Sequence, residues 1–553
     1  MESWRLLVCM VVVLSSSFIA SSSTFSATPF EDDFLDCLRF NSHDSKLEVY
    51  TPNNSSYSSI LQFSMYNLRF ISPTTPKPQY IVVPSHESQV QTVVVCSRKH
   101  GLQVRVRSGG HDFEGLSYTS HVAFILIDIV NLRAVDVDVQ ENSAWVQAGA
   151  TLGEVYYRIA EKSRLHGFPA GFCPTVGVGG HFSGGGYGGM MRKYGVAADH
   201  IVDARIVNAN GEILNRETMG EDLFWAIRGG GAASFGVILA FKIKLVQVPP
   251  IVTVSLVDRT LDQHVMQIIL KWQHIASYQV PEELFIQVYV YTVANNYDNN
   301  NTNSTRRGLQ TQFQIMHLGP REELMHLMEE KLPELEIKRE DCRETSWIES
   351  AVVFGGFPNT APLDVLLDRT MQEKFAFKAK SDFVTTSISK VGLKKIFEKL
   401  LEEENVRVSL SPWGGKMNEI PDDEIAFPHR AGNMYVFEYM ISWNEKEESA
   451  RASQMHINWI RELYNYMSPY VSMNPRAAYL NVRDLDLGHN KANETPTYSE
   501  ARIWGEKYFK GNFKKLVEVK SEVDPHNFFT NEQSIPPILT FKSMRNEGLV
   551  VIS

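Results

Sequence analysis

Short apolar runs alternate with helical segments over residues 80–245. Strands are predicted where apolar residues are continuous or alternate with polar ones, at 81–83, 103–107, 124–129 and 144–148. A helix is predicted to begin at a Ser85 cap and to end at the basic residues before Gly101, and Thr151 opens a second helix. This succession predicts an α+β domain with mixed strands.

Pro249 and Pro250 interrupt that pattern, and longer strands follow. Segments 284–293 and 309–318 predict two strands joined by an Asn-rich polar loop, as in a solvated hairpin. Helical stretches lie between further strand segments, for example at 321–331 and 393–404. An antiparallel sheet covered by helices accounts for this alternation.

The changes of pattern divide the chain. We predict a first domain over 28–250 and a second over 251–478. The stretch 524–537 is turn-rich, and we expect the last segment, 479–553, to return to the first domain.

The most apolar run of the sequence is at its start. Arg5 precedes the run Leu6–Leu14, and small residues follow. This order is typical of a signal peptide, here 1–25 with cleavage between Ala20 and Ala27, and the run is too short to span a bilayer. We expect a secretory-pathway protein, secreted to the apoplast or held in a vacuole or an ER-derived vesicle, with no membrane segment in its mature form.

Composition narrows the class of protein. The 553 residues are 43% hydrophobic and 21% charged, which is typical of a soluble globular protein of two or three domains and excludes disorder. Lys and Arg total 54 against 64 Asp and Glu, for a formal net charge of -10. Because a negative net charge gives no general attraction to polyanions, we expect no nucleic-acid partner.

Four cysteines remain after signal-peptide cleavage, namely Cys37, Cys96, Cys173 and Cys342. In an oxidising compartment four thiols allow three full pairings. Cys37 sits in an apolar segment with Phe34, Leu35 and Leu38, and Cys96 follows the apolar run 93–95, so a bond between them fits. Cys173 lies in a glycine-rich loop that suits an inert thiol poorly. N-glycosylation sequons agree with secretion and occur at Asn53, Asn54, Asn300, Asn303 and Asn493.

Two segments carry unusual composition, RSGGHDFEG at 107–115 and a glycine-rich stretch at 171–195. Eight glycines fall within 177–189. That density weakens regular structure, so it indicates that the backbone must approach a phosphate or a flat ring closely.

Several common sites are excluded by context. Gly184, Gly186 and Gly189 have the spacing of a dinucleotide-binding fingerprint, but no apolar strand precedes them and no capped helix with a suitable acid follows. No P-loop occurs. The histidines show no paired spacing for metal ligands, so we expect no metal.

The two unusual segments resemble the flavin-attachment signatures of the berberine bridge enzyme-like family, which has the vanillyl-alcohol oxidase type of FAD-binding fold. The matching motifs are RSGGH (107–111), CPTVGVGGH (173–181), WAIRGGGAASFGV (225–237), YLNVRDLDLG (479–488), and DPHNFF with QSIPP (524–537). With the FLDCL segment at Cys37, they cover essentially the whole mature chain in family order. The resemblance implies a PCMH-type FAD-binding domain from about 76 to 250 and a substrate domain with an antiparallel sheet.

By this resemblance the cofactor is FAD, bonded through an imidazole nitrogen of His111 to the flavin 8α-methyl and through the Cys173 sulfur to C6. Both side chains are nucleophiles toward an electron-poor ring, and two links would raise its potential as an oxidant. Backbone amides of 108–111 and 175–183 are expected to hold the pyrophosphate. The other implied cofactor-binding residues are Arg107, Ser108, Gly109, Gly110, Thr175, Val176, Gly177, Gly179, Gly180, His181, Ser183, Val237 and Asn527.

Val176 matches the family position that gates dioxygen. A smaller residue there leaves room beside the flavin, so valine favours an oxidase over a dehydrogenase. Ordinary packing of a buried valine is the alternative.

Segment 434–443 predicts a strand with aromatic residues on one face and Glu438 among mostly apolar residues on the other. Such surroundings raise a carboxyl pKa toward the range of a general base. The resemblance makes Glu438 the catalytic glutamate of alkaloid-oxidising members. A structural carboxylate paired with Arg or Lys is the alternative.

The sequence departs from the family at two positions. Phe113 stands where many members have Tyr, and Val482 where they have Tyr or His. Both changes remove a group that handles protons, which leaves Glu438 as the main candidate base. We expect a mainly apolar pocket with Phe113, Val482, Val436 and Met440 as its walls.

The leading hypothesis is a monomeric FAD-dependent oxidase of a plant phenolic or alkaloid, which transfers a hydride to the flavin and electrons to dioxygen with release of hydrogen peroxide. A second hypothesis is oxidation of a monolignol or oligosaccharide alcohol. In a third, motivated by the missing proton-handling groups, the flavin is a scaffold in a non-redox cyclase or a ligand-binding protein.

Overall fold

The computed structural model describes residues 29–538 except 42–46, 296–305, 371–373, 445–448, 492, 493 and 495. The predicted signal peptide and the sequons at Asn300, Asn303 and Asn493 lie outside the described residues. Asn53 and Asn54 lie within them and are exposed. In this described part, no helix combines the length and apolar character needed to cross a bilayer.

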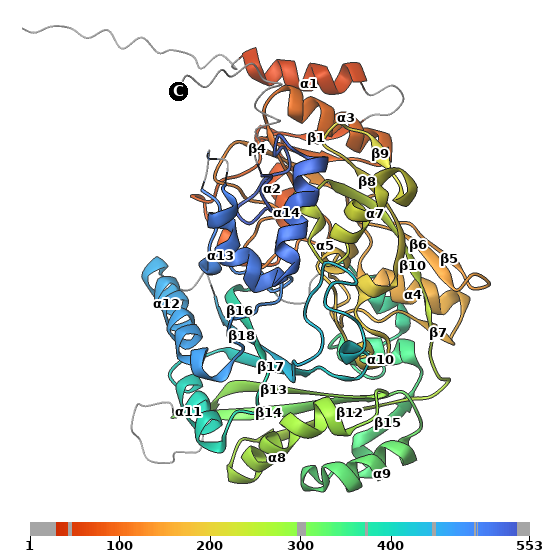
Figure 1. Ribbon diagram of the computed structural model, residues 1–553, viewed down its shortest axis with the longest axis vertical. Coiled ribbons are helices and arrows are strands. Elements are labelled where there is room, and N and C mark those ends of the chain that lie inside the picture. The colour runs from red at the N-terminus through yellow and green to blue at the C-terminus, as the bar shows by residue number, and fades with distance from the viewer. Residues whose placement is uncertain are drawn as a thin grey trace, which may run out of the picture.

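The first part of the chain forms two main sheets (Figure 1). Their strands are β1 (Glu48–Tyr50), β2 (Tyr80–Val83), β3 (Gln103–Arg107), β4 (Phe124–Asp128), β5 (Val135–Asp138), β6 (Ser143–Gln147), β8 (Ile201–Val207), β9 (Ile213–Leu214) and β10 (Val237–Lys244). The order β1-β2-β4-β3 contains parallel pairs at β4 and an antiparallel β1. The order β5-β6-β10-β8-β9 is antiparallel, and a short pair joins β7 (His166–Gly167) to β11 (Val246–Gln247). The mixed strands predicted from the sequence are confirmed.

Helices α1 (Pro29–Asn41), α2 (Tyr57–Phe63), α3 (Glu87–Lys99), α4 (Leu152–Lys162), α5 (Val178–Ser183), α6 (Met191–Tyr194) and α7 (Arg216–Ala226) belong to this part. Thr151 caps α4 as predicted, because its N–H donates to the Glu154 carboxylate at 2.9 Å and its hydroxyl accepts from the Glu154 N–H. The cap predicted at Ser85 is wrong by one residue. His86 is the N-cap of α3, and Ser85 instead donates its N–H to the Gln89 side chain.

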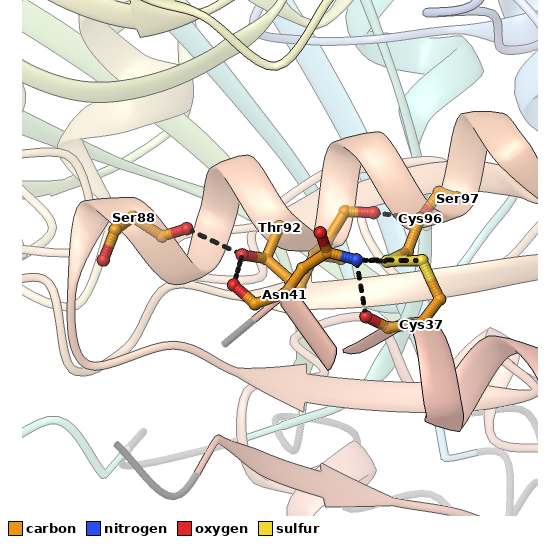
Figure 2. Close-up of a disulfide and its surroundings, with 7 residues drawn as sticks. Cys37, Asn41, Ser88, Thr92, Cys96 and Ser97 are labelled. Carbon is orange, nitrogen blue, oxygen red and sulfur yellow. Dashed lines mark hydrogen bonds between the residues drawn. A yellow bond between two sulfur atoms is a disulfide. The ribbon is translucent and has the colours of Figure 1, made fainter. Parts of the chain in front are cut away.

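A disulfide between Cys37 and Cys96 joins α1 to α3 (Figure 2). Beside it, the Asn41 side-chain amide donates to the Cys37 carbonyl at 2.9 Å. The sequence allows three ways to join all four cysteines in two disulfides. The structure has none of these full pairings, because Cys173 and Cys342 are both free. The bond that forms is the one that fits the apolar surroundings of its cysteines, and it fastens the N-terminal helix to the first domain.

The second part of the chain forms one seven-stranded antiparallel sheet. Its strands are β12 (Val252–Thr260), β13 (Leu284–Asn295), β14 (Arg306–His317), β15 (Cys342–Thr345), β16 (Ala376–Val384), β17 (Val406–Pro412) and β18 (Tyr435–Trp443), in the order β15-β12-β14-β13-β17-β18-β16. The predicted hairpin is β13 and β14, which pair from Leu284–His317 to Asn295–Arg306. The prediction of an antiparallel sheet is confirmed.

Helices cover the face of this sheet that points away from the first domain (Figure 1). These helices are α8 (Gln263–His274), α9 (Arg321–Lys331), α11 (Lys390–Leu400) and α12 (Ala450–Met467). A further helix, α10 (Trp347–Phe354), packs against the first domain, where Trp347 contacts Tyr156 of α4. The aromatic face of β18 is core as predicted, and Tyr435 packs on Trp272 of α8 at a centroid distance of 5.3 Å. The opposite face of the sheet is therefore turned toward the first domain.

The end of the chain returns to the first domain through α13 (Tyr498–Phe509) and α14 (Asn512–Val523), drawn in blue in Figure 1. The buried ammonium of Lys520 donates to the Ser234 carbonyl at 2.6 Å and to Asp524 at 2.7 Å. The N–H of Ile535 donates to the Ser234 hydroxyl at 3.1 Å. These contacts place α14 and the segment at Ile535 against the first domain.

Candidate active site

A cavity of about 690 Å³ lies between the first domain and the seven-stranded sheet. The turn 106–113, the glycine-rich loop 172–187 and residues 231–238 line one side. Side chains of β13, β14, β17 and β18 form the opposite side, and residues 479–483 close an end. The cavity is large enough for a cofactor together with a small molecule.

The two glycine-rich segments touch backbone to backbone at Gly109 and Gly177. A Cβ on Gly109 would lie 2.2 Å from the Gly177 nitrogen, and one on Gly177 would lie 2.1 Å from the Gly109 nitrogen. Any side chain at either position would therefore separate the segments. This contact explains the glycine content that the sequence shows at these positions.

Backbone N–H groups without a hydrogen-bond partner in the described residues face the cavity along the turn 106–113. The backbone N–H groups of Gly109, Gly110 and His111 donate to no acceptor in the part of the chain that the structure describes. Across from them, no atom lies within 4 Å of a Cβ built on Gly180. Adjacent free N–H groups beside open space suit an anion, so these residues fit the pyrophosphate of FAD.

One threonine hydroxyl contacts both predicted attachment residues. Thr175 Oγ1 lies 3.0 Å from Nε2 of His111 and 3.6 Å from the Cys173 sulfur. Burial lowers the pKa of His111 to about 3, so its imidazole is neutral. When Nε2–H donates to Thr175, the ring lone pair is on Nδ1 and the threonine hydrogen can point toward sulfur. The arrangement suits both side chains to nucleophilic attack on a bound ring.

His181 supports the loop that carries Cys173. Its Nε2 accepts the N–H of Gly171 at 3.0 Å, which requires an unprotonated nitrogen. Burial lowers the pKa of His181 to about 4, in agreement with a neutral ring. His181 therefore acts on the cofactor side of the cavity by holding backbone.

Tyr187 and Glu438 form an acid–base pair at the other side of the cavity. The Tyr187 hydroxyl donates to Glu438 Oε1 at 2.8 Å, and the Ser409 hydroxyl lies 3.5 Å from Oε2. Burial raises the pKa of Glu438, while Tyr187, Arg407 and Ser409 oppose that rise. Burial and the neighbouring carboxylate raise the pKa of Tyr187 well above its usual value. Glu438 is therefore the group of the pair that accepts a proton near neutral pH.

The ion pair considered for Glu438 is not formed: among the described residues, no Lys or Arg makes a salt bridge with this carboxylate. Its partners are two hydroxyl groups. A carboxylate with neutral partners in a cavity wall is free to bind a proton from a ligand.

The floor of the cavity is more polar than the sequence predicts. Residues at alternate positions of the strands face it, and their neighbours in each strand are in the core beneath the helices. The floor residues are Gln287, Tyr289, Tyr291, Gln312, Gln314, Arg407 and Glu438. Amide, phenol and guanidinium groups can fix the orientation of a ligand by hydrogen bonds.

Most of the predicted cofactor-binding residues line the cavity. These are Ser108, Gly109, Gly110, His111, Cys173, Val176, Gly177, Gly179, Gly180, His181, Ser183 and Val237. Arg107 does not, because its buried guanidinium donates to Asp128 at 2.6 Å and to the carbonyls of Leu61 and Ile60. Asn527 lies in the turn after α14, where its N–H donates to the Asp524 carbonyl.

Of the predicted substrate-pocket walls, Phe113 and Val482 line the cavity. Val436 and Met440 share the face of Glu438 on β18, but both are packed in the core and neither contributes to the lining. The sequence places side chains on a face of a strand, but it does not show which part of that face a neighbouring domain covers.

The sequence reasoning missed Tyr187, Arg407 and the polar residues of β13 and β14. The signal for the strands is the alternation in 284–293, where Gln287, Tyr289 and Tyr291 recur at every second position. Tyr187 is the aromatic residue within the densest glycine run. Nothing in the local sequence pairs it with Glu438.

A buried charged cluster ties the cofactor turn to the second sheet. Lys378 of β16 contacts the Glu114 carboxylate and donates to Asp484 at 2.6 Å. Lys380 donates to Asp484 at 2.6 Å and to Asp486 at 2.8 Å. Because Phe113 precedes Glu114 and Val482 is close to Asp484 in the chain, the cluster fixes two cavity walls. No group of three or more metal-ligand residues is present in the described part of the chain.

Comparison with known proteins agrees with this geometry. Residues 78–216 match the family model of an FAD binding domain, and residues 478–536 match the model described as berberine and berberine like. A tetrahydroberberine oxidase of Berberis wilsoniae is 54% identical over 95% of this chain and 97% of its own. Monolignol oxidoreductase AtBBE-like 13 of Arabidopsis thaliana is 48% identical over 95% of this chain and 96% of its own. The structure of berberine bridge enzyme from Eschscholzia californica has a TM-score of 0.86 and 38% identity, covering 92% of this chain and 100% of that one.

Proposed function

The chain belongs to the berberine bridge enzyme-like family of FAD-linked oxidoreductases, and from that premise we propose that it oxidises a small phenolic or alkaloid substrate with dioxygen as the final acceptor. FAD, when bound, accepts a hydride from the substrate and passes two electrons to dioxygen, which is released as hydrogen peroxide. The observation that carries the proposal is the Tyr187–Glu438 pair, because it lines the same cavity as His111 and Cys173.

The residues of this chain would hold the cofactor at three places. Backbone N–H groups of 109–111 bind the pyrophosphate, and His111 and Cys173 each form one covalent bond to the ring. The shared contact with Thr175 supports this double attachment. Tryptic mass mapping tests it: a single flavin joined to both peptides is expected, and flavin that is fully released on denaturation would contradict it.

Glu438 would take the proton from a substrate hydroxyl or amine while the substrate is oxidised. Tyr187 holds Oε1 of the carboxylate, so the ionised side chain keeps its place in the cavity wall. Ser411 supports Tyr187 in turn, since the two hydroxyl oxygens are 3.3 Å apart. A positioned base of this kind contributes about 10²- to 10⁴-fold to a rate.

Val176 would admit dioxygen. It lines the cavity two residues after Pro174 in the loop of Cys173, and its side chain is only partly buried. A valine at the wall leaves space that a longer side chain would fill. This position supports oxidase over dehydrogenase activity.

Anaerobic mixing of the flavin-loaded protein with candidate substrates is the decisive experiment. Loss of the flavin absorbance, followed on aeration by its return and by peroxide, is expected for an oxidase. Turnover of a substrate without loss of absorbance would instead favour the non-redox hypothesis, in which the flavin is a scaffold.

Oxidation of an alcohol, as in a monolignol or an oligosaccharide, is a second candidate function. The observation in its favour is the polar floor, where Gln287, Gln312 and Gln314 offer hydrogen bonds to hydroxyl groups. Competition between a phenolic amine and a cinnamyl alcohol at equal concentration separates the two functions. The substrate that is consumed first identifies the preferred class.

We also propose that the protein passes through the secretory pathway. The Cys37–Cys96 disulfide and the exposed Asn53 and Asn54 support this, since both features suit an oxidising, glycosylating compartment. A shift in mass after endoglycosidase treatment of protein from plant cells is expected. Unmodified protein in the cytosol would contradict the proposal.

A further inference from the structure

The guanidinium of Arg407 lies at the cavity without a carboxylate partner. Arg407 is an exposed residue of β17, opposite Tyr291 of β13, and its Cζ is 5.9 Å from the centre of the Tyr289 ring. Among the residues that the structure describes, no Asp or Glu forms a salt bridge with it. Arg483, which also lines the cavity, differs in this respect because it pairs with Asp112 at 3.0 Å.

Two acids near this part of the floor already accept hydrogen bonds. Glu438 of β18, the strand beside β17, accepts from Tyr187, and among the described residues it forms no salt bridge with Arg407. Asp258 of β12 accepts from the Gln312 amide at 3.0 Å and from the Tyr291 hydroxyl at 3.3 Å. The Gln314 amide donates to the Gln312 carbonyl at 2.8 Å. These bonds order the neutral side chains of β13 and β14 on the floor. Because no salt bridge from the described residues uses Arg407, its charge is available to a ligand.

A second group, Gln287, faces the cavity from β13, two residues from Tyr289 and four from Tyr291. Gln287 is 2% exposed, and its Nε2 donates to Ser411 at 2.6 Å, but its Oε1 accepts no hydrogen bond from any residue that the structure describes. If the amide were turned over, Nε2 would be the unpaired atom. In either orientation, a buried amide atom on the cavity wall lacks a partner that a ligand can provide.

The two groups lie at opposite ends of one floor. Gln287 and Tyr291 are four residues apart on β13, which corresponds to about 13 Å along a strand, and Arg407 is at the level of Tyr291. Tyr289 lies between them and offers an aromatic face. Gln287 is at the end near Tyr187, because both contact Ser411. Glu438 is at the level of Tyr289, since both are paired with Ser409 of β17.

We infer that the cavity binds an aromatic hydroxy acid, whose carboxylate is bound by Arg407 and whose hydroxyl end reaches Gln287 beside Tyr187 and Glu438. Arginine suits this role because its planar fork binds a carboxylate through two parallel hydrogen bonds. The inference rests on the proposed function and narrows its substrate class to phenolic acids. Cationic amines are disfavoured at the Arg407 end by like charge.

The test compares 4-hydroxycinnamic acid with its methyl ester as ligands of the flavin-loaded protein. Dissociation constants are measured from the change that each probe causes in the visible spectrum of the bound flavin. The acid is expected to bind about tenfold more tightly than the ester, which is about 1.4 kcal/mol. In Arg407→Gln the ratio falls to about one, and Arg407→Lys gives an intermediate ratio because the charge stays and the fork is lost.

Arg158→Gln is the matched control, since this exposed arginine of α4 pairs with Glu161 of the same helix and does not line the cavity. It should leave the ratio unchanged. Equal binding of acid and ester to the parent protein, or an unchanged ratio in Arg407→Gln, overturns the inference. Tighter binding of tyramine than of the acid also overturns it, because the site would then select cations.

Failure of the acid-site inference can be distinguished from failure of the proposed oxidase function. If an alcohol or amine reduces the flavin anaerobically while acid and ester bind equally, the oxidase proposal holds and the acid site is wrong. If the acid is preferred through Arg407 while no substrate reduces the flavin, the acid site holds and the oxidase proposal is wrong.

Discussion

The hydroxyl of Tyr187 lies 2.8 Å from Oε1 of Glu438, although 251 positions separate the two residues in the chain. Tyr187 comes from the glycine-rich loop of the first domain, and Glu438 comes from β18 of the large sheet. The two meet only when the sheet packs against the first domain. The candidate base is therefore assembled by the same packing that forms the cavity.

Glu438→Gln should slow reduction of the flavin by substrate about 10²- to 10⁴-fold, because the amide cannot accept the substrate proton. Stopped-flow absorbance under anaerobic conditions measures this rate directly. Glu419→Gln is a suitable control, since Glu419 is exposed and pairs with Lys416 away from the cavity. Equal reduction rates in Glu438→Gln and the parent protein would exclude this carboxylate as the base.

Tyr187→Phe should move the pH dependence of flavin reduction to higher pH. Glu438 acts when ionised, so the rate rises as pH passes its pKa. Burial raises that pKa and the bond from Tyr187 lowers it, so loss of the hydroxyl lets the pKa rise further. A pH profile of reduction checks the direction, with Tyr278→Phe, which alters an exposed ring, as the control. A shift toward lower pH would contradict the assignment.

Thr175→Val should reduce the fraction of protein that carries flavin on both His111 and Cys173. The substitution keeps the shape and removes the hydroxyl that contacts both side chains. Intact mass and peptide mapping give the fractions with one and two links. Thr175→Ser retains a hydroxyl and should restore double attachment; if both variants attach flavin like the parent protein, the hydroxyl has no part in it.

Val176→Leu should slow reoxidation of the reduced protein by dioxygen about tenfold, a change of about 1.4 kcal/mol in the barrier. The added methylene group fills the space beside the cavity wall. Flavin reduction by substrate should be unaffected, so the two half-reactions are measured separately by stopped flow. Unchanged reoxidation would leave Val176 with a packing role only.

Lys378→Met should destabilise the protein by about 3–5 kcal/mol, because removing one member of a buried ion pair leaves an uncompensated charge. The carboxylates of Glu114 and Asp484 would lose their shared cation. Denaturant unfolding measures the loss. Lys394→Met, in an exposed pair on α11, is the control and should change stability by less than about 1 kcal/mol.

The same cluster should make the free energy of unfolding depend on pH in acid. Although burial opposes it, Lys378 and Arg69 lower the pKa of Glu114, and the neighbouring cations lower that of Asp486. A depressed carboxyl pKa stabilises the fold above the unfolded-state pKa, and this stability is lost as pH falls through the folded-state value. Unfolding free energy should therefore decline below about pH 4.5, and the decline should be shallower in Lys378→Met.

Local features of this fold follow from local sequence. Thr151 and Glu154 define the start of α4, and alternation in 434–443 places Glu438 opposite the aromatic face of β18. The helix start depends on two residues three positions apart, and the strand face depends on residues two positions apart. The family motifs in addition place His111 and Cys173, which the structure brings to one threonine hydroxyl.

Features that depend on the packing of distant segments were not predictable in this way. Arg107 is adjacent to the attachment motif, yet its guanidinium turns away from the cavity to Asp128. Val436 and Met440 share a face with Glu438 but are covered by other core residues. The partner of Glu438 and the open position of Arg407 follow from how the sheet meets the first domain, which no periodicity encodes.

The polar floor and the helix-covered core occupy opposite faces of the same strands, at alternate residues. A change at Tyr289, Gln312 or Arg407 thus leaves the residues that fold the sheet intact, and none of these positions belongs to the segments that would hold FAD. Such a division allows inherited variation to retarget the enzyme to new metabolites while its redox chemistry is retained. It also offers the protein engineer a small set of positions to randomise with little risk to expression.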